Sequence, residues 1–122
     1  MIKIICDGSG NGKYALVVYD SSGKKIHYQV SLGGETNNEA EYLAVISSLD
    51  YASKQLEPTL IITDSQLVVN QILGKYQVNA ENLKPLCRKA RSLLDRSPHI
   101  TIQWKPRINV TEADQLMRSD VL

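Results

Sequence analysis

Two aspartates of this 122-residue chain come directly after short apolar segments. Asp7 follows residues 2–6 (IKIIC), and Asp64 follows residues 60–63 (LIIT). Open α/β sheets bind their ligands outside the carboxyl ends of parallel strands, so an acid at such a position can reach a ligand. If the two strands are parallel neighbours, the acids lie roughly 5 Å apart, and ionised carboxylates that close repel each other unless a cation lies between them. The pattern therefore predicts a divalent metal site at the ends of these strands.

Each acid of interest also has a structural alternative. Asp64 could cap a following helix, Asp7 could stabilise the turn after it, and Asp114 could occupy the third position of a helix. Glu41 lacks such a role, because Glu39 already stands at the capping-box position and Glu41 points to a different face of the same turn. We therefore expect Glu41 to be available for a ligand.

Three strands are predicted in the first part of the chain, at residues 2–7, 14–19 and 26–32. The first two are apolar and rich in β-branched residues, and a turn at 20–23 (DSSG) precedes the third. The third alternates strictly, as in a strand with one buried face, with four apolar residues on one side: Ile26, Tyr28, Val30 and Leu32. Short links between the three predict an antiparallel meander.

The hydrophobic period changes to that of a helix after Thr36. A capping box of Thr36 and Glu39 begins a helix of about four turns. The strand at 60–63 then leads into a helix that ends at Gly74. The elements predicted beyond it are a helix over 80–95, a strand over 100–104 and a short helix from near Thr111. This order of strands and helices predicts an α/β fold, a mixed sheet with helices on its faces.

Composition fits one soluble domain over residues 1–122. The 43% hydrophobic content is enough for a core without disulfides, and Cys6 and Cys87 are expected in that core. No leader peptide or membrane span is evident, so a cytoplasmic protein is expected. The net charge of +1 does not by itself indicate nucleic-acid binding, although basic residues gather in the last third: Lys84, Arg88, Lys89, Arg91, Arg96, Lys105 and Arg107.

Four short motifs resemble, in order and spacing, those of type 1 ribonucleases H. They are DGSG at 7–10, TNNEAEY at 36–42, TDSQ at 63–66 and EADQL at 112–116. The resemblance covers essentially the whole chain. It implies the ribonuclease H-like fold, a five-stranded mixed sheet with helices on both faces.

The same resemblance implies an endonuclease that hydrolyses the RNA strand of RNA–DNA hybrids. Asp7 and Asp64 would bridge two Mg²⁺ ions, Glu41 would join one of them, and Asp114 would bind the other. Oxygen ligands suit Mg²⁺ or Mn²⁺, and a two-metal-ion mechanism would leave 5′-phosphate and 3′-hydroxyl ends.

The resemblance also implies substrate-binding residues. Asn37, Asn38 and Gln66 match amides that contact base edges in the minor groove, where the pattern of donors and acceptors is degenerate. Asn37 and Asn38 have a structural alternative as helix caps. The family distinguishes RNA by its 2′-hydroxyl with the catalytic glutamate and first-loop groups, here Glu41 together with Gly8, Ser9 and Gly10.

The chain departs from the family pattern at several places. Residues 11–19 leave a shorter first loop than many members have, and Val110 replaces a common asparagine. The loop before the last aspartate has no histidine, and Arg107 is the nearest polar substitute. Residues 74–85 connect two helices directly, without the basic protrusion of longer members. Trp104 is expected in the core.

Two other functions are compatible with these residues. A related nuclease could also cut double-stranded RNA, because a metal site does not choose the substrate. Alternatively, the chain could be a weakly active or inactive nucleic-acid-binding module. No membrane association and no obligate protein partner are expected.

Overall fold

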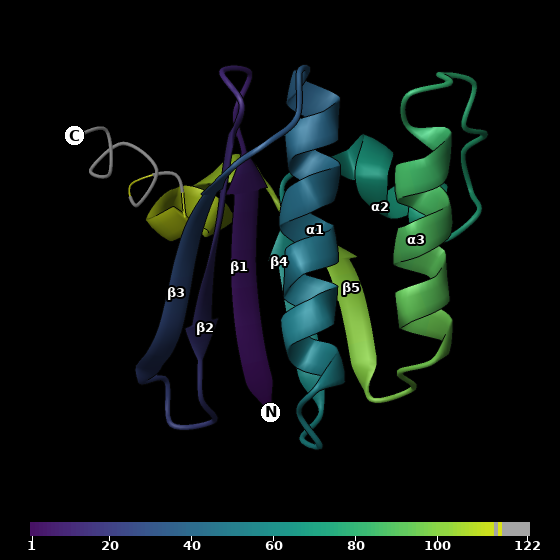
Figure 1. Ribbon diagram of the computed structural model, residues 1–122. Helices are drawn as coiled ribbons and strands as arrows, with labels where there is room; N and C mark the ends of the chain where they lie inside the picture. Colours follow the sequence, from purple (N-terminus) through teal and green to yellow (C-terminus); the bar gives the residue numbers. More distant parts are fainter. Residues whose placement is uncertain (114, 116–122) are drawn as a thin grey trace.

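The computed structural model describes residues 1–113 and 115, and it arranges five strands in one mixed sheet (Figure 1). The strands lie in the order β3-β2-β1-β4-β5. The first three pair antiparallel, while β1 with β4 and β4 with β5 pair parallel. Their bounds are β1 Ile2–Gly8, β2 Lys13–Tyr19, β3 Lys25–Leu32, β4 Thr59–Thr63 and β5 Ile100–Trp104. The predicted meander and mixed α/β sheet are confirmed.

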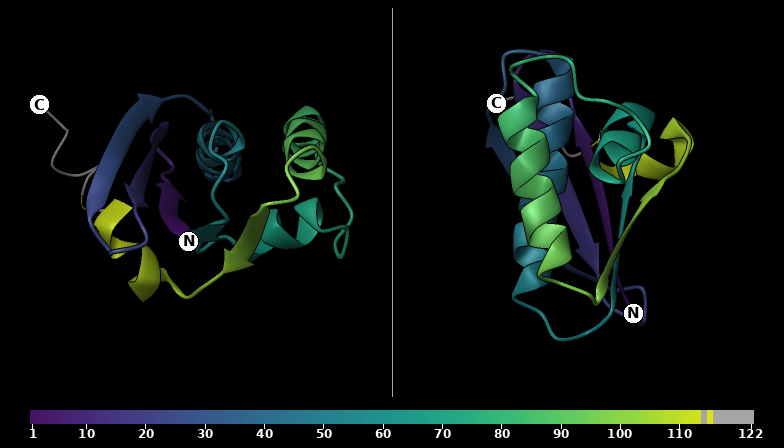
Figure 2. Two further views of the ribbon diagram at one scale, coloured as in Figure 1. Left: turned by 90° about the horizontal axis from the view of Figure 1, so that it is seen from below. Right: turned by 90° about the vertical axis from the view of Figure 1, so that its right-hand side faces the viewer.

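Helices cover both faces of this sheet (Figure 2). The long helices α1 (Asn37–Ser53) and α3 (Lys84–Asp95) pack against each other on one face. The 3₁₀ turn η1 (Arg107–Val110) lies on the opposite face, against β1 and β4. The short helix α2 (Gln66–Ile72) follows β4 and contacts α3 and β5. Among the described residues, no helix has the length and apolar character to cross a membrane.

The main core lies between α1, α3 and the sheet. Burying one large aliphatic side chain contributes about 1.5–3 kcal/mol, so this layer holds α1 firmly on the strands. The predicted capping box fixes the start of α1, since Thr36 Oγ1 accepts from Glu39 N and the Glu39 carboxylate accepts from Thr36 N. Members of the core without exposed surface include Ile4, Leu16, Val45, Leu49 and Ile61.

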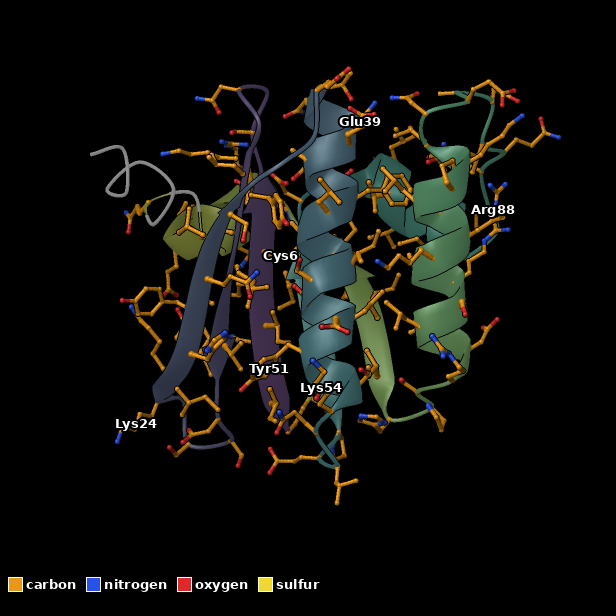
Figure 3. All side chains as sticks on the ribbon, in the orientation of Figure 1. Cys6, Lys24, Glu39, Tyr51, Lys54 and Arg88 are labelled. Atoms are coloured by element: carbon orange, nitrogen blue, oxygen red, sulfur yellow. The ribbon has the colours of Figure 1, made fainter. Side chains whose placement is uncertain are left out.

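The alternation in β3 has the opposite sense to the one expected. Tyr28 is 61% exposed and Leu32 is 79% exposed, so the apolar side is largely the open one. His27, on the polar side, stacks on Tyr51 with 4.9 Å between ring centroids, and Tyr51 extends from α1 toward β3 (Figure 3). Tyr28 pairs with Val17 of β2, and cross-strand partners share a face, so the apolar side belongs to the face opposite α1, which is less covered.

The helix predicted over 80–95 begins later, at Lys84. Pro85 is the reason, because proline has no N–H to donate and its ring collides with the carbonyl four residues earlier. It is tolerated only in the first turn, where α3 places it. Near the end of the described chain, residues 111–113 are helical as expected, and η1 precedes them directly.

Candidate active site

Asp7 and Asp64 meet because their strands are parallel neighbours. Ile5 of β1 pairs with Ile62 of β4, and each aspartate lies two residues further along its strand direction. The expected convergence of the two strand ends is therefore present. Asp64 does not cap α2, since Ser65 does so by accepting from Val68 N at 3.2 Å. Its carboxylate is left for another partner.

Glu41 reaches the aspartates through a close contact between β1 and α1. A Cβ on Gly8 would lie 2.4 Å from Ala40 C and 2.5 Å from Glu41 N, which no side chain tolerates. Glycine thus allows the first turn of α1 to touch the end of β1. The amide of Gly8 then donates to Asp7 Oδ1 at 2.9 Å and to Glu41 Oε1 at 2.5 Å.

The three acids form a compact cluster of oxygen ligands. One carboxylate oxygen from each of Asp7, Glu41 and Asp64 lies within 4.8 Å of the others. Asp7 is 1% and Glu41 6% exposed, so neither charge is well solvated. Within the described part of the chain, the buried side-chain oxygens without a hydrogen-bond partner are Asp7 Oδ2 and Asp64 Oδ1. Carboxylate oxygens of three residues thus meet at one point, two of these residues have an unpartnered oxygen, and this arrangement fits a hard divalent cation.

Burial and mutual repulsion perturb the titration of the cluster. Burial, followed by the negative charge of Asp64, raises the pKa of Asp7 from 3.8 to about 6. Burial raises the pKa of Glu41 well above its ordinary 4.5, and the charges of Asp7 and Asp64 raise it further. Without a cation, the folded protein therefore resists full ionisation of the cluster, and a bound cation would relieve this.

The proposed substrate-binding residues surround the cluster at one end of the sheet. Asn37 and Asn38 are exposed at the start of α1, and Gln66 is exposed at the start of α2. Because Thr36 caps α1, neither asparagine is the N-cap residue. Gly8 is buried under α1, while Ser9 is half-buried and Gly10 is exposed in the turn after β1. Asp114 lies outside the described residues.

The end of β5 and the segment after it contribute contacts that the sequence does not predict. Trp104 is 41% exposed instead of being in the core, and its Nε1 donates to Asp64 O at 3.2 Å. Arg107 Nη1 lies 3.2 Å from Asp64 Oδ2. Arg107 is the nearest polar residue to the place where other family members have a histidine. Its ion pair with Asp64, a candidate metal ligand, has no signature in the sequence.

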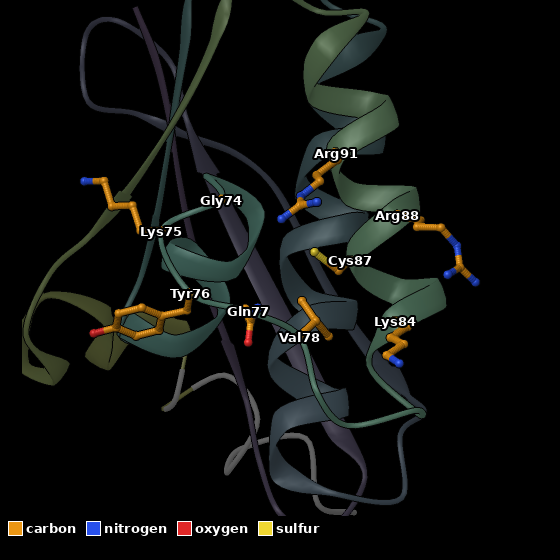
Figure 4. A pocket seen from close by; sticks show the side chains of 9 residues that line it. All are labelled: Gly74, Lys75, Tyr76, Gln77, Val78, Lys84, Cys87, Arg88 and Arg91. Carbon is orange, nitrogen blue, oxygen red and sulfur yellow. The ribbon is translucent and has the colours of Figure 1, made fainter.

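A second polar feature is a cavity of about 420 Å³ between the loop after α2 and α3 (Figure 4). Arg91 points toward α2 and donates to Gln71 O at 2.7 Å and Ile72 O at 3.3 Å. Gln71 in turn accepts a hydrogen bond from Tyr42 of α1 at 2.7 Å. The residues that line the cavity are Gly74, Lys75, Tyr76, Gln77, Val78, Lys84, Cys87, Arg88 and Arg91.

Comparison with known proteins assigns the family. Residues 5–119 match the family described as reverse transcriptase-like. The chain is also 34% identical over 87 residues to the ribonuclease HI of Halobacterium salinarum, a match that covers 70% of this chain and 44% of that protein. This chain belongs to the ribonuclease H family. The resemblance to type 1 ribonucleases H is therefore confirmed.

Other ribonuclease H proteins match over nearly the whole chain. The bifunctional protein Rv2228c of Mycobacterium tuberculosis is 33% identical over 123 residues, which are 94% of this chain and 34% of that protein. The chain thus spans about a third of the length of this relative. The solved ribonuclease H domain of Rv2228c has a TM-score of 0.83, with 97% of this chain and 94% of that one covered at 32% identity.

A further solved relative is LC11-RNase H1, isolated from compost and crystallised with an RNA/DNA hybrid. Its TM-score is 0.84, with 29% identity, and the match covers 98% of this chain and 95% of that one. The ribonuclease H-like fold predicted from the motifs is therefore confirmed.

Proposed function

We propose that this chain is a metal-dependent endonuclease that hydrolyses the RNA strand of RNA–DNA hybrids. The carrying observation is the cluster of Asp7, Glu41 and Asp64, which come from β1, α1 and the end of β4 and have two unpartnered buried oxygens. A purely structural set of acids would be hydrogen-bonded or solvated. LC11-RNase H1, a relative in complex with an RNA/DNA hybrid, supports the same substrate class.

The donor set fits Mg²⁺, with Mn²⁺ as the second candidate. Asp7, Glu41 and Asp64, together with Asp114, would hold two such ions. Bound divalent ions supply Lewis-acid chemistry for phosphodiester hydrolysis, which would leave 5′-phosphate and 3′-hydroxyl ends. The protein's own part is to fix the carboxylates: the Gly8 amide orients both Asp7 Oδ1 and Glu41 Oε1.

Substrate recognition is assigned to the polar groups around the cluster. The exposed amides of Asn37, Asn38 and Gln66 both donate and accept, which suits a minor groove with little sequence information. Glu41 and the turn residues Gly8, Ser9 and Gly10 would contact the 2′-hydroxyl that marks the RNA strand. Low sequence specificity follows from this arrangement.

The cavity between the loop after α2 and α3 adds positive charge for the nucleic-acid backbone. Lys75, Lys84 and Arg88 line it, and phosphate contacts of this kind position a duplex without reading its sequence. Tyr76, at 44% exposure, offers a ring for packing on a sugar. This cavity would partly replace the basic protrusion of longer members.

A cleavage assay with labelled duplexes tests the proposal. The RNA–DNA hybrid, duplex RNA and duplex DNA are each incubated with Mg²⁺, with Mn²⁺ and with EDTA, and Asp64→Asn controls for contaminating nucleases. We expect cutting of the RNA strand of the hybrid only, dependent on metal and lost in the variant. Cutting of duplex RNA as well would support the broader nuclease, whereas binding of the hybrid without any cutting would support the binding module.

A cytoplasmic location stays a prediction.

A further inference from the structure

Arg107 is held beside the carboxylate cluster by the segment that carries it. Lys105 N donates to Thr63 O at 3.0 Å, and Trp104 Nε1 donates to Asp64 O at 3.2 Å. These bonds fasten the chain after β5 to the end of β4. The turn η1, which begins with Arg107, then packs on β1 and β4. These contacts thus bring Arg107 next to Asp64.

The ion pair between Arg107 and Asp64 is asymmetric. The Arg107 side chain is 62% exposed and the Asp64 side chain 10% exposed. Asp64 is confined between the end of β4 and the capped start of α2, whereas the Arg107 side chain lies largely in solvent. If the pair opens, Arg107 is therefore the partner that moves. A guanidinium stays charged at any ordinary pH, so the pair cannot be broken by deprotonation of Arg107.

The pair also conflicts with metal binding. Arg107 Nη1 contacts Asp64 Oδ2, one of the two oxygens of a carboxylate in the proposed metal site. Two cations at one carboxylate repel each other, so a divalent ion in the cluster weakens the hold of Arg107 on Asp64. In the absence of metal, the same guanidinium is a positive charge that Asp64 faces from η1.

We propose that Arg107 is an exchangeable counter-ion and a positioning residue of the metal site. It holds the Asp64 carboxylate in place while the cluster is without a cation, and it releases Asp64 Oδ2 when a divalent ion binds. This inference rests on the proposed metal site. It goes beyond that site by giving the Arg107 side chain two positions, one in contact with Asp64 and one away from it.

Mn²⁺ titration followed by electron paramagnetic resonance measures the competition directly. The wild type is compared with Arg107→Gln, with Arg107→Lys and with Lys105→Gln, a control that removes the same charge from the same segment. Exposed ion pairs shift an equilibrium by about fivefold or less, so we expect Arg107→Gln to bind Mn²⁺ about twofold to fivefold more tightly. Arg107→Lys should lie near wild type, and Lys105→Gln should change less than Arg107→Gln.

Unfolding in urea supplies a second readout that does not depend on catalysis. Arg107→Gln should lower stability in EDTA and leave it unchanged in saturating Mg²⁺, as linkage requires if metal replaces the arginine. In an Asp64→Asn background the same substitution should have a smaller effect in EDTA, because the ion pair with Asp64 is already absent.

Each contrary result would overturn a different part of the proposal. Equal Mn²⁺ affinity in Arg107→Gln, Lys105→Gln and wild type would overturn the counter-ion role alone. Weaker binding by Arg107→Gln would overturn the release and make the arginine a support of the bound ion. Absence of Mn²⁺ binding by the wild type would overturn the metal site, and this inference with it.

Discussion

At the scale of single residues, the cluster holds buried carboxylates close together with too few hydrogen-bond donors. Asp7 and Glu41 are buried, their pKa values are raised, and an oxygen of Asp7 has no hydrogen-bond partner. Such an arrangement costs stability in the absence of a ligand. It is typical of sites where function and folding stability are in conflict.

Replacement of Asp7 by Asn tests this conflict. Removing one of the crowded charges should raise the free energy of unfolding in EDTA by about 1 kcal/mol, since one pKa unit corresponds to about 1.4 kcal/mol and relaxation reduces the gain. Loss of a proposed metal ligand should slow hybrid cleavage by about a thousandfold, because metal-ion stabilisation of the transition state is worth several kcal/mol. Urea unfolding and single-turnover cleavage measure the two effects. A variant that cuts at the wild-type rate would contradict the two-metal assignment.

The sequence predicted the residues of this cluster better than their surroundings. Asp7 and Asp64 could be singled out because both follow apolar strands, whereas the parallel pairing of those strands was only a condition of the prediction, which the structure meets. The ion pair of Arg107 and the exposure of Trp104 could not, since both depend on how the segment after β5 folds back over β4.

At the scale of elements, the contact between β1 and α1 decides whether the cluster forms. The contact exists because Gly8 has no side chain, and it places Glu41 opposite Asp7. By contrast, the alternation in β3 predicted a strand correctly but not which of its sides is covered. The alternation of apolar and polar residues shows that the two faces of the strand differ. The position of α1 decides which of these faces is buried.

Gly8→Ala should separate these two elements. The added Cβ would meet the backbone of Ala40 and Glu41 at 2.4–2.6 Å, so α1 must shift. We expect a loss of about 3 kcal/mol in the free energy of unfolding, the upper part of the range for overpacking. Gly10→Ala is the matched control, since nothing lies within 4 Å of its added Cβ. If urea unfolding shows equal stability for the two variants, the close approach of β1 and α1 does not hold α1 in place.

The three helices are joined through one buried hydrogen-bonded glutamine. Gln71 of α2 accepts from Tyr42 of α1, while its backbone carbonyl accepts from Arg91 of α3. Tyr42→Phe removes the donor and leaves Gln71 Oε1 buried without it, which should cost about 1–3 kcal/mol. Thermal or urea unfolding measures this loss, with Tyr28→Phe on the exposed side of β3 as the control. An effect no larger than that of the control would mean that water or another donor takes the place of the hydroxyl.

At the scale of the whole molecule, the raised pKa values link folding to pH and to metal. The folded-state pKa of Asp7 is about 6 against an ordinary value of 3.8, so between these values the folded protein binds more protons than the unfolded chain. Stability of the metal-free protein should therefore fall as pH rises through this window, and the raised pKa of Glu41 extends the decline above it. Metal binding requires the deprotonated carboxylates and strengthens as pH rises, so saturating Mg²⁺ should offset the decline.

Urea unfolding from about pH 4 to about pH 8, in EDTA and in Mg²⁺, measures this linkage for the wild type and Asp7→Asn. Surface carboxylates with lowered pKa values, such as Asp20 and Glu39, affect both proteins equally and cancel in the difference. The advantage of Asp7→Asn in EDTA should grow as pH rises toward about 6, because the wild-type aspartate becomes ionised in this range. A difference that stays constant across the window would mean that Asp7 titrates normally and that the cluster carries no electrostatic strain. A difference that grows in EDTA and reverses in Mg²⁺ would show that the bound cation replaces the missing protons, which ties the stability of the fold to the same carboxylates that the proposed hydrolysis needs.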